Sequence, residues 1–197
     1  MAEFLTRRTQ YLRAVALETA KMSYPGRMGG VVTAGTKKAV AEYFVKEFPM
    51  GDVWENAAKI AKRFDHWHDR RVRELGKCIQ GRVKKRTDRC EALAAKFFNT
   101  FMHQLMKYEA CRPLWQHLHL PLDKRILVAL GRLKRSVGSL ALEEVAGVLR
   151  NPPYAISYAE YLQVQQALRN LLTELNRRAR SEIKLKSRIE LNLLWAE

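Results

Sequence analysis

The histidines and cysteines are the side chains in this sequence that could hold a metal ion or act as nucleophiles. They are His66, His68, His103, His117, His119, Cys78, Cys90 and Cys111. A structural zinc ion needs four ligands, usually in two close pairs, and no two of these cysteines are close in sequence. Their odd number and wide spacing also argue against a disulfide framework and fit a reducing compartment. The sequence therefore predicts no metal site, and its helical pattern places His68 in the core.

The segment Gly30–Lys37, GVVTAGTK, could contact phosphate. It differs from a phosphate-binding P-loop in the order of its Lys and hydroxyl residues. It also lacks a preceding apolar strand and an Asp partner for magnesium, so we exclude nucleotide hydrolysis. Free N–H groups at the start of a helix capped by Thr36, with Lys37 and Lys38 beside them, would still form a phosphate contact. The alternative is a flexible loop that only precedes a helix.

Two segments, Arg63–His68 and Arg112–His117, carry an Arg and then a His after four intervening residues. This spacing resembles the Arg-x4–6-His pattern of the helical HEPN-type ribonucleases, and the resemblance would imply RNA cleavage. That family usually has a polar residue directly after the Arg, where this chain has Phe or Pro. His68 also projects about 140° away from Arg63 on a helix, so one helix face does not hold both. A ribonuclease stays an alternative, and we predict no catalytic residue.

A row of basic residues is the strongest functional signal in the sequence. We predict a helix from Asp52 to about Ile79, because its apolar residues recur at helical spacing. With about 100° per residue, one stripe of that helix contains Lys59, Arg63, His66, Arg70, Arg73 and Lys77. The stripe about 200° away contains Ala61, Phe64, His68, Val72, Leu75 and Ile79. One face is therefore expected to be buried and the opposite face to be cationic.

The charge excess is concentrated around this row. Between residues 59 and 89 there are twelve Lys and Arg residues and four Asp and Glu residues, which supplies half of the net charge of +16. Like charges three or four residues apart destabilise a helix, and an external anion relieves that cost. A large basic excess also attracts polyanions, above all the phosphates of nucleic acid. The alternatives are a solvated face without a partner, an acidic protein or an anionic lipid surface.

We therefore expect phosphate contacts from the basic residues in and around this helix. These are Lys59, Lys62, Arg63, Arg70, Arg73, Lys77, Arg82, Lys84, Lys85 and Arg86. Secondary candidates are Lys37, Lys38, Arg132, Lys134 and Arg135. Trp67 lies at the edge of the cationic face, where an exposed ring could stack on an unpaired base. The alternative for Trp67 is a ring that covers the margin of the core.

The elements that must position these residues are predicted to be helices almost throughout the chain. We expect an all-α helical bundle of about six to eight helices. Besides the helix at 52–79, they fall near residues 4–22, 36–48, 87–108, 126–135, 139–149 and from 157 onward. Asp52 with Glu55, and Ser157 with Glu160, have the spacing of a capping box. One domain is expected over residues 1–197, with its weakest point near 150–156, where two prolines would separate a C-terminal helical hairpin.

Taken together, these patterns predict a non-catalytic protein that binds RNA or DNA by its phosphate backbone through a basic helix face. A helical subunit of a larger nucleoprotein complex, with other protein subunits as partners, fits this class. The rival is an adaptor that binds an acidic protein or an anionic membrane surface through the same face. Basic residues interrupt the apolar residues of the N-terminus, and no apolar run is long enough to span a membrane. We expect a cytoplasmic protein with no cofactor and no membrane partner.

Overall fold

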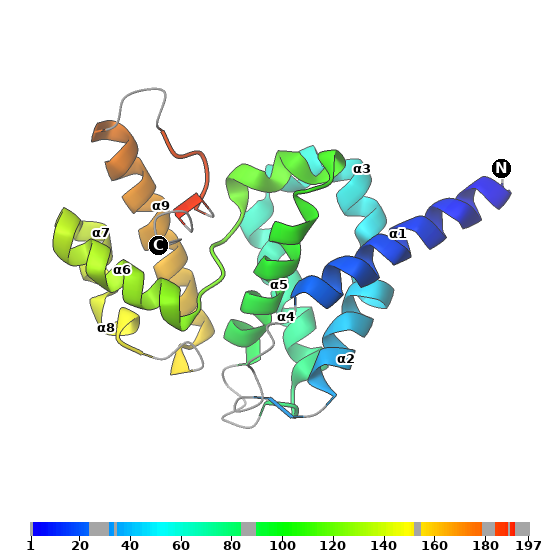
Figure 1. The fold of residues 1–197 in the computed structure, drawn as a ribbon, viewed down its shortest axis with the longest axis horizontal. Helices are drawn as coiled ribbons and strands as arrows, with labels where there is room; N and C mark the ends of the chain where they lie inside the picture. Colours follow the sequence, from blue (N-terminus) through cyan, green and yellow to red (C-terminus); the bar gives the residue numbers. More distant parts are fainter. Residues whose placement is uncertain are drawn as a thin grey trace. The chain divides into compact units, whose positions relative to one another are not determined.

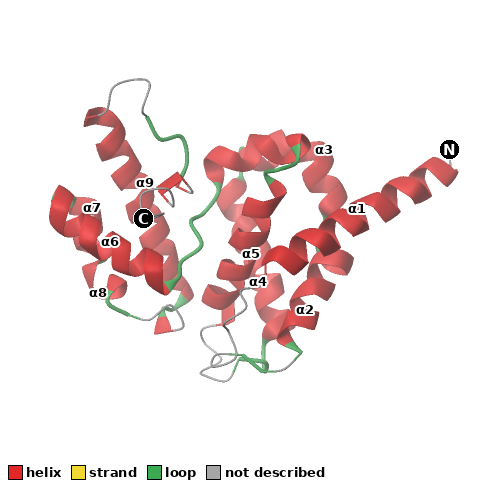
Figure 2. Cartoon of the chain, viewed as in Figure 1, coloured by secondary structure: helices red, strands yellow, loops and turns green. Residues whose placement is uncertain are grey.

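The protein is all-α, as predicted. Its computed structural model describes residues 2–23, 32, 33, 35–83, 90–151, 155–178, 184–188, 190 and 191. Within those residues lie nine α-helices, a π-helix, a 3-10 helix and one isolated β-bridge. Figure 2 shows the helices in red. Eight of these helices have seven or more residues, which confirms the predicted helical class. Contacts within the chain group it into two compact units: unit 1, residues 1–115, and unit 2, residues 116–197.

Unit 1 is built around helices α4 (Phe64–Ile79) and α5 (Cys90–Leu105), which pack along each other (Figure 1). Helix α1 (Ala2–Ser23) packs against α5, the π-helix η1 (Tyr43–Glu47) and α3 (Met50–Ala61). The short helix α2 (Thr36–Glu42) packs against α4. The 3-10 helix η3 (Glu109–His117) runs across the boundary between the units.

A cluster of aromatic rings fills the core of unit 1. Its members are Phe44, Phe48, Phe64, Trp67, Phe98 and Phe101. The rings of Phe44 and Phe101 stack with their centroids 3.7 Å apart and an interplanar angle of 6°. Phe98 is fully buried and contacts rings from η1, from α4 and from the residue that follows η1. Because these rings anchor one side of α4, the opposite side of that helix is held facing outward.

The helix predicted from Asp52 to Ile79 is in fact two helices. α3 ends at Ala61, α4 begins at Phe64, and a turn lies between them. Arg63 leaves helical geometry, with φ −132° and ψ 32°, and its N–H donates to the Ile60 carbonyl oxygen at 2.9 Å. Asn56 is also non-helical inside α3, with φ −122° and ψ 21°. The 100° register does not continue through such breaks, so the cationic stripe predicted from residue 59 to 77 is continuous only on α4.

Two predicted helix caps are also wrong. α3 begins at Met50, which places Asp52 inside its first turn instead of at the cap. Gly35 occupies the cap position of α2 with φ 86°, a left-handed conformation that favours glycine. Thr36 is the first residue of α2, and its hydroxyl donates to the Thr33 carbonyl oxygen at 2.9 Å.

Unit 2 consists of α6 (Lys124–Val137), α7 (Leu140–Glu144), α8 (Ala146–Leu149) and α9 (Tyr158–Arg178), with short segments beside them. α6 packs against α7 and α8, and α7 packs against α9. The predicted capping box at the start of α9 is confirmed. The Ser157 N–H donates to Glu160 Oε2 at 2.7 Å, and the Glu160 N–H donates to Ser157 Oγ at 3.2 Å. These bonds satisfy N–H groups that lie before the first helical turn closes.

Buried polar side chains tie the irregular segments of unit 2 to α9. Gln165 accepts a hydrogen bond from the Leu120 N–H at 3.0 Å and donates one to the Leu120 carbonyl oxygen at 2.8 Å. Arg188 is also buried and donates to the Gln165 carbonyl oxygen on α9 at 3.4 Å and to the His117 carbonyl oxygen at 2.7 Å. Ser139, which precedes α7, donates to Glu174 Oε2 at 2.6 Å. Unit 2 is therefore stabilised by these buried side-chain hydrogen bonds, which we call the polar brackets, in addition to its aliphatic core.

The expected weak point near 150–156 lies inside unit 2, because α7 and α9 pack together from either side of it. The division between the units falls at residues 115 and 116 instead, within η3. Pro152 and Pro153 lie outside the described residues. That residues 1–197 form one domain stays a prediction.

Candidate nucleic-acid interface

The outward side of α4 carries four residues of the predicted cationic row. His66, Arg70, Arg73 and Lys77 are all exposed, and we call them the α4 face. The opposite side, formed by Phe64, His68, Val72, Leu75 and Ile79, is buried, as its spacing predicts. Arg73 pairs with Asp69 at 3.0 Å on the rim of the face. Among the described residues, no ion pair involves Arg70 or Lys77.

The basic residues that precede α4 are exposed but belong to other elements. Lys59 lies on α3, and Lys62 and Arg63 lie in the turn between α3 and α4. All three are exposed. Because the helix breaks at this turn, these residues flank the α4 face and do not extend its row.

At the other end of α4, the structure brings together predicted contacts that are far apart in sequence. Val32 and Val83 form an isolated antiparallel bridge, and the Thr33 N–H donates to the Arg82 carbonyl oxygen at 2.7 Å. A Cβ on Gly35 would lie 3.2 Å from Arg82 Nη1, so the guanidinium group lies directly against the start of α2. Lys37 and Lys38, both exposed, follow in that helix.

This juxtaposition differs from the P-loop-like contact considered from the sequence. The Thr36 N–H, which would have been free for phosphate, donates to the Thr33 carbonyl oxygen at 3.3 Å. The Thr36 N–H at this helix start is therefore occupied, and Lys37, Lys38 and Arg82 bring positive charge to it. Lys84, Lys85 and Arg86, which were also expected to contact phosphate, lie outside the described residues.

Of the two interpretations of Trp67, an exposed stacking ring and a ring that covers the margin of the core, the structure supports the second. The ring is only 8% exposed and lies 6.1 Å from Phe48, 5.9 Å from Phe64 and 5.7 Å from Phe98, measured between ring centroids. It thus covers the margin of the core, and a base cannot stack on it while these contacts persist. The helical projection placed Trp67 at the edge of the cationic face. Its burial is decided by the rings of Phe48, which follows η1, and Phe98 on α5, together with Phe64 on its own helix.

The histidines of the HEPN-like pattern differ in their surroundings. His68 is fully buried, and its Nε2 lies 2.8 Å from Asn99 Oδ1, a contact between α4 and α5. Arg63 is exposed, so this Arg and His do not form one accessible pair. In the second match Arg112 is exposed, and His117 is partly buried with its carbonyl oxygen bonded to Arg188. His68 is therefore a core residue, as its place on the apolar stripe predicted.

Tyr43, Arg71 and Glu74 form a polar cluster in unit 1 that the sequence did not reveal. The Tyr43 hydroxyl donates to the Arg71 carbonyl oxygen at 3.1 Å and lies 3.3 Å from Glu74 Oε2, which pairs with Arg71 at 2.6 Å. Burial and the Glu74 charge raise the pKa of Tyr43 above its usual range. Burial likewise raises the pKa of the Cys78 thiol and brings that of Cys111 to about 11. These thiols stay protonated near neutral pH and are poor nucleophiles.

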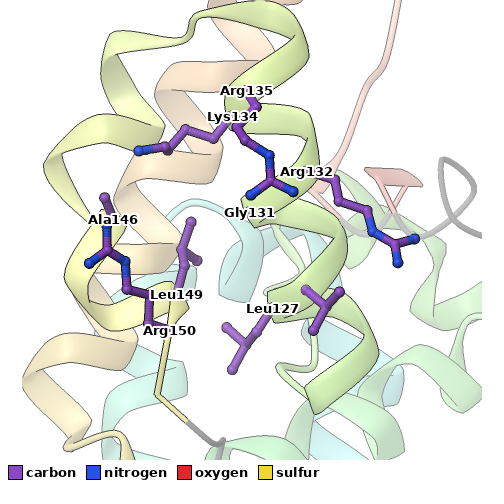
Figure 3. Close-up of a pocket in the computed structure, with 9 residues that line it drawn as sticks. Leu127, Gly131, Arg132, Lys134, Arg135, Ala146, Leu149 and Arg150 are labelled. Carbon is purple, nitrogen blue, oxygen red and sulfur yellow. The ribbon is translucent and has the colours of Figure 1, made fainter.

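A second basic surface lies in unit 2, where α6 and α8 enclose an open groove of about 510 Å³ (Figure 3). We call it the α6–α8 groove. Its lining consists of Leu127, Val128, Gly131, Arg132, Lys134, Arg135, Ala146, Leu149 and Arg150. Three of these, Arg132, Lys134 and Arg135, were secondary candidates from the sequence. Arg150 was missed, since it ends a different helix and no local spacing connects it with α6.

The charges of the groove are arranged around an apolar floor. In Figure 3, Arg132 points away from α8, whereas Lys134 extends from α6 in the opposite direction. Lys134 Nζ lies 2.8 Å from Glu143 Oε2 on α7. Arg132, Arg135 and Arg150 have no ion-pair partner among the described residues. Leu127 and Leu149 are buried beneath them, and Val128 is 46% exposed.

Comparisons with protein-family models, with curated proteins and with solved structures found no match for this chain. In the part of the chain that the structure describes, no three His, Cys, Asp or Glu side chains come together as a metal ion would require. No helix in that part is long and apolar enough to cross a membrane.

Proposed function

We propose that the protein binds RNA or DNA without catalysis, by contacts between the α4 face and the phosphate backbone. The observation that carries this proposal is the α4 face itself, in which His66, Arg70, Arg73 and Lys77 are exposed along one side of a helix. The other side of that helix is locked into an aromatic core. Because the helix cannot rotate inward, its backbone holds these residues on the outward side, and only their side chains must be ordered when phosphates bind.

The neighbouring basic residues support the same proposal. Arg82, Lys37 and Lys38 lie near the end of α4, and Lys59, Lys62 and Arg63 lie before its start. A phosphate backbone that crosses the α4 face would therefore meet further cations on both sides. Each Lys or Arg that neutralises a phosphate releases condensed counterions, which makes the affinity fall steeply with salt. Such a protein suits a helical subunit that holds a strand inside a larger nucleoprotein complex.

The test is a salt titration of binding, measured by the fluorescence anisotropy of a labelled single strand and a labelled duplex. Removing two charges in Arg70→Ala/Lys77→Ala should lower the slope of log affinity against log salt by about 1.4 on single strands and 1.8 on duplex. At about 0.1 M salt the affinity should fall about tenfold or more. The same mixtures with RNA, run on a denaturing gel, should contain only the intact strand.

The matched control is Arg13→Ala/Lys21→Ala, which removes two exposed charges from α1. It changes the net charge equally, so it separates a contact of the α4 face from a general effect of charge. We expect its salt slope to stay close to that of the parent. The proposal would be overturned if the two double variants lost equal affinity for nucleic acid. It would also be overturned if the affinity of the parent did not change with salt. If the parent protein cleaves RNA and Arg112→Ala/His117→Ala does not, the result would favour the ribonuclease alternative.

A further inference from the structure

The α6–α8 groove differs from a plain phosphate-binding surface because it combines cations with exposed apolar area. Val128 is 46% exposed on α6, above the buried Leu127 and Leu149. A phosphate group gains nothing from such a floor, since it contacts only the cations. An occupant that uses the whole groove must carry negative charge and apolar side chains on the same surface.

The charge of unit 2 is concentrated at this groove. Between residues 124 and 150 there are six Lys and Arg residues and two Asp and Glu residues. In the rest of unit 2, residues 116–123 and 151–197, there are seven and six. Four of the five excess positive charges in unit 2 therefore come from the segment that holds α6, α7 and α8. The lining itself contains three Arg, one Lys and no acidic residue.

A carboxylate is the group that this rim already binds. Glu143, from the chain itself, pairs with Lys134 at 2.8 Å. Arg132, Arg135 and Arg150 have no such partner among the described residues, and a guanidinium group can bind a carboxylate with two parallel hydrogen bonds. Side chains three and four residues apart on a helix lie on one face, so a peptide helix can present carboxylates beside apolar residues.

We propose that the α6–α8 groove is a docking site for an acidic, amphipathic segment of a partner protein. The apolar side chains of the segment cover Val128 and the leucine floor, and its Asp or Glu residues pair with Arg135 and Arg150 on the rim. This inference does not rest on nucleic-acid binding by the α4 face, because it concerns different residues in the other unit.

The experiment uses the full chain and a fluorescein-labelled synthetic peptide of about fourteen residues. Glu and Asp line one edge of this peptide, and Leu and Phe recur at helical spacing beside them. Its anisotropy should rise on titration with the protein. A peptide of the same composition in scrambled order, and one with Gln and Asn in place of the acids, should bind at least about tenfold more weakly.

Three variants locate the binding. Arg135→Glu/Arg150→Glu should weaken binding by about tenfold or more, because like charges then meet across the interface. Val128→Ser removes exposed apolar area and should weaken binding about four- to tenfold. Lys124→Glu/Arg125→Glu makes the same change of charge on exposed residues of α6 outside the groove, and should have little effect. A Lys-containing peptide should regain affinity for Arg135→Glu/Arg150→Glu, which would not happen if that variant were merely misfolded.

Each other occupant of the groove gives a different result. Absence of peptide binding at low salt overturns the proposal. A single-stranded oligonucleotide that competes with the peptide, together with full binding by Val128→Ser, identifies a phosphate site instead and also overturns it. If the parent chain forms dimers that Val128→Ser and Arg135→Glu/Arg150→Glu both dissociate, the groove is occupied by a second copy, and the partner proposal is wrong.

Discussion

The α4 face and the α6–α8 groove are both strongly basic, yet they differ in what lies beneath the charges. The α4 face is one side of a single helix whose other side is held by aromatic rings, and its exposed residues are all polar. The groove is assembled from two helices around an apolar floor, in a unit fastened by polar brackets. We therefore propose a different kind of ligand for each surface: a regular polyanion for the row on one helix, and a partner with apolar side chains for the groove with an apolar floor.

The largest expected effect comes from removing the support of the α4 face. Phe98→Ala deletes a fully buried ring of the aromatic core and should destabilise unit 1 by about 3–5 kcal/mol. Nucleic-acid binding should then be lost at lower urea than in the parent, while peptide binding by the groove survives to higher urea.

Binding of both ligands, followed by anisotropy across a urea titration, checks this prediction. Tyr11→Ala, which truncates a ring that is 54% exposed in the same unit, is the control and should cost less than about 1 kcal/mol. If Phe98→Ala abolishes nucleic-acid binding and peptide binding at the same urea concentration, the two units unfold together. The α4 face and the α6–α8 groove are then not independent surfaces.

A smaller effect on stability is expected from removing the hydrogen bonds between the Gln165 side chain and the backbone of Leu120 in unit 2. Gln165→Leu leaves the buried N–H and carbonyl oxygen of Leu120 without their side-chain partner, at a cost of about 2 kcal/mol or more. Gln166→Leu, the exposed neighbour on the same helix, is the matched control and should change stability by less than about 0.5 kcal/mol. Urea unfolding followed by circular dichroism gives both values. Equal stability of the two variants would mean that the brackets do not hold unit 2 together.

The smallest effect concerns pH and unit 1. Burial lowers the pKa of His103 below the ordinary value of 6.5. The unfolded chain therefore takes up this proton first as the pH falls, so the stability linked to a neutral His103 is present at neutral pH and declines below about pH 6.5. The urea midpoint of the parent should fall more between about pH 7.5 and 5.5 than that of His103→Gln. Identical pH profiles would remove His103 as a source of acid sensitivity.

Local spacing was sufficient to predict several of these features. The exposed and buried sides of α4 follow from helical periodicity, and the capping box of Ser157 and Glu160 follows from a spacing of three residues. Both are properties of consecutive residues, which a sequence pattern contains in full.

The features that the sequence did not predict depend on contacts between distant residues. Lys62 and Arg63 include no Gly or Pro, so nothing local indicates that the helix breaks there. Trp67 is buried by rings distant in sequence, Phe48 and Phe98, and Arg150 reaches the groove because α8 packs against α6. For Trp67 and Arg150 tertiary packing decides the outcome, and the helical projection of one segment cannot contain it.

The bridge between Val32 and Val83 has a consequence for the order in which the molecule folds. It closes a loop that contains α2, η1, α3 and α4 in full. Closing a long loop costs chain entropy, so contacts of this kind form after the local helices. We therefore expect the basic row on α4 to form early in folding. The contact that brings Lys37 and Lys38 beside the end of α4 should form late. A chain still being synthesised would then expose its cations to nearby polyanions before its basic surface is complete.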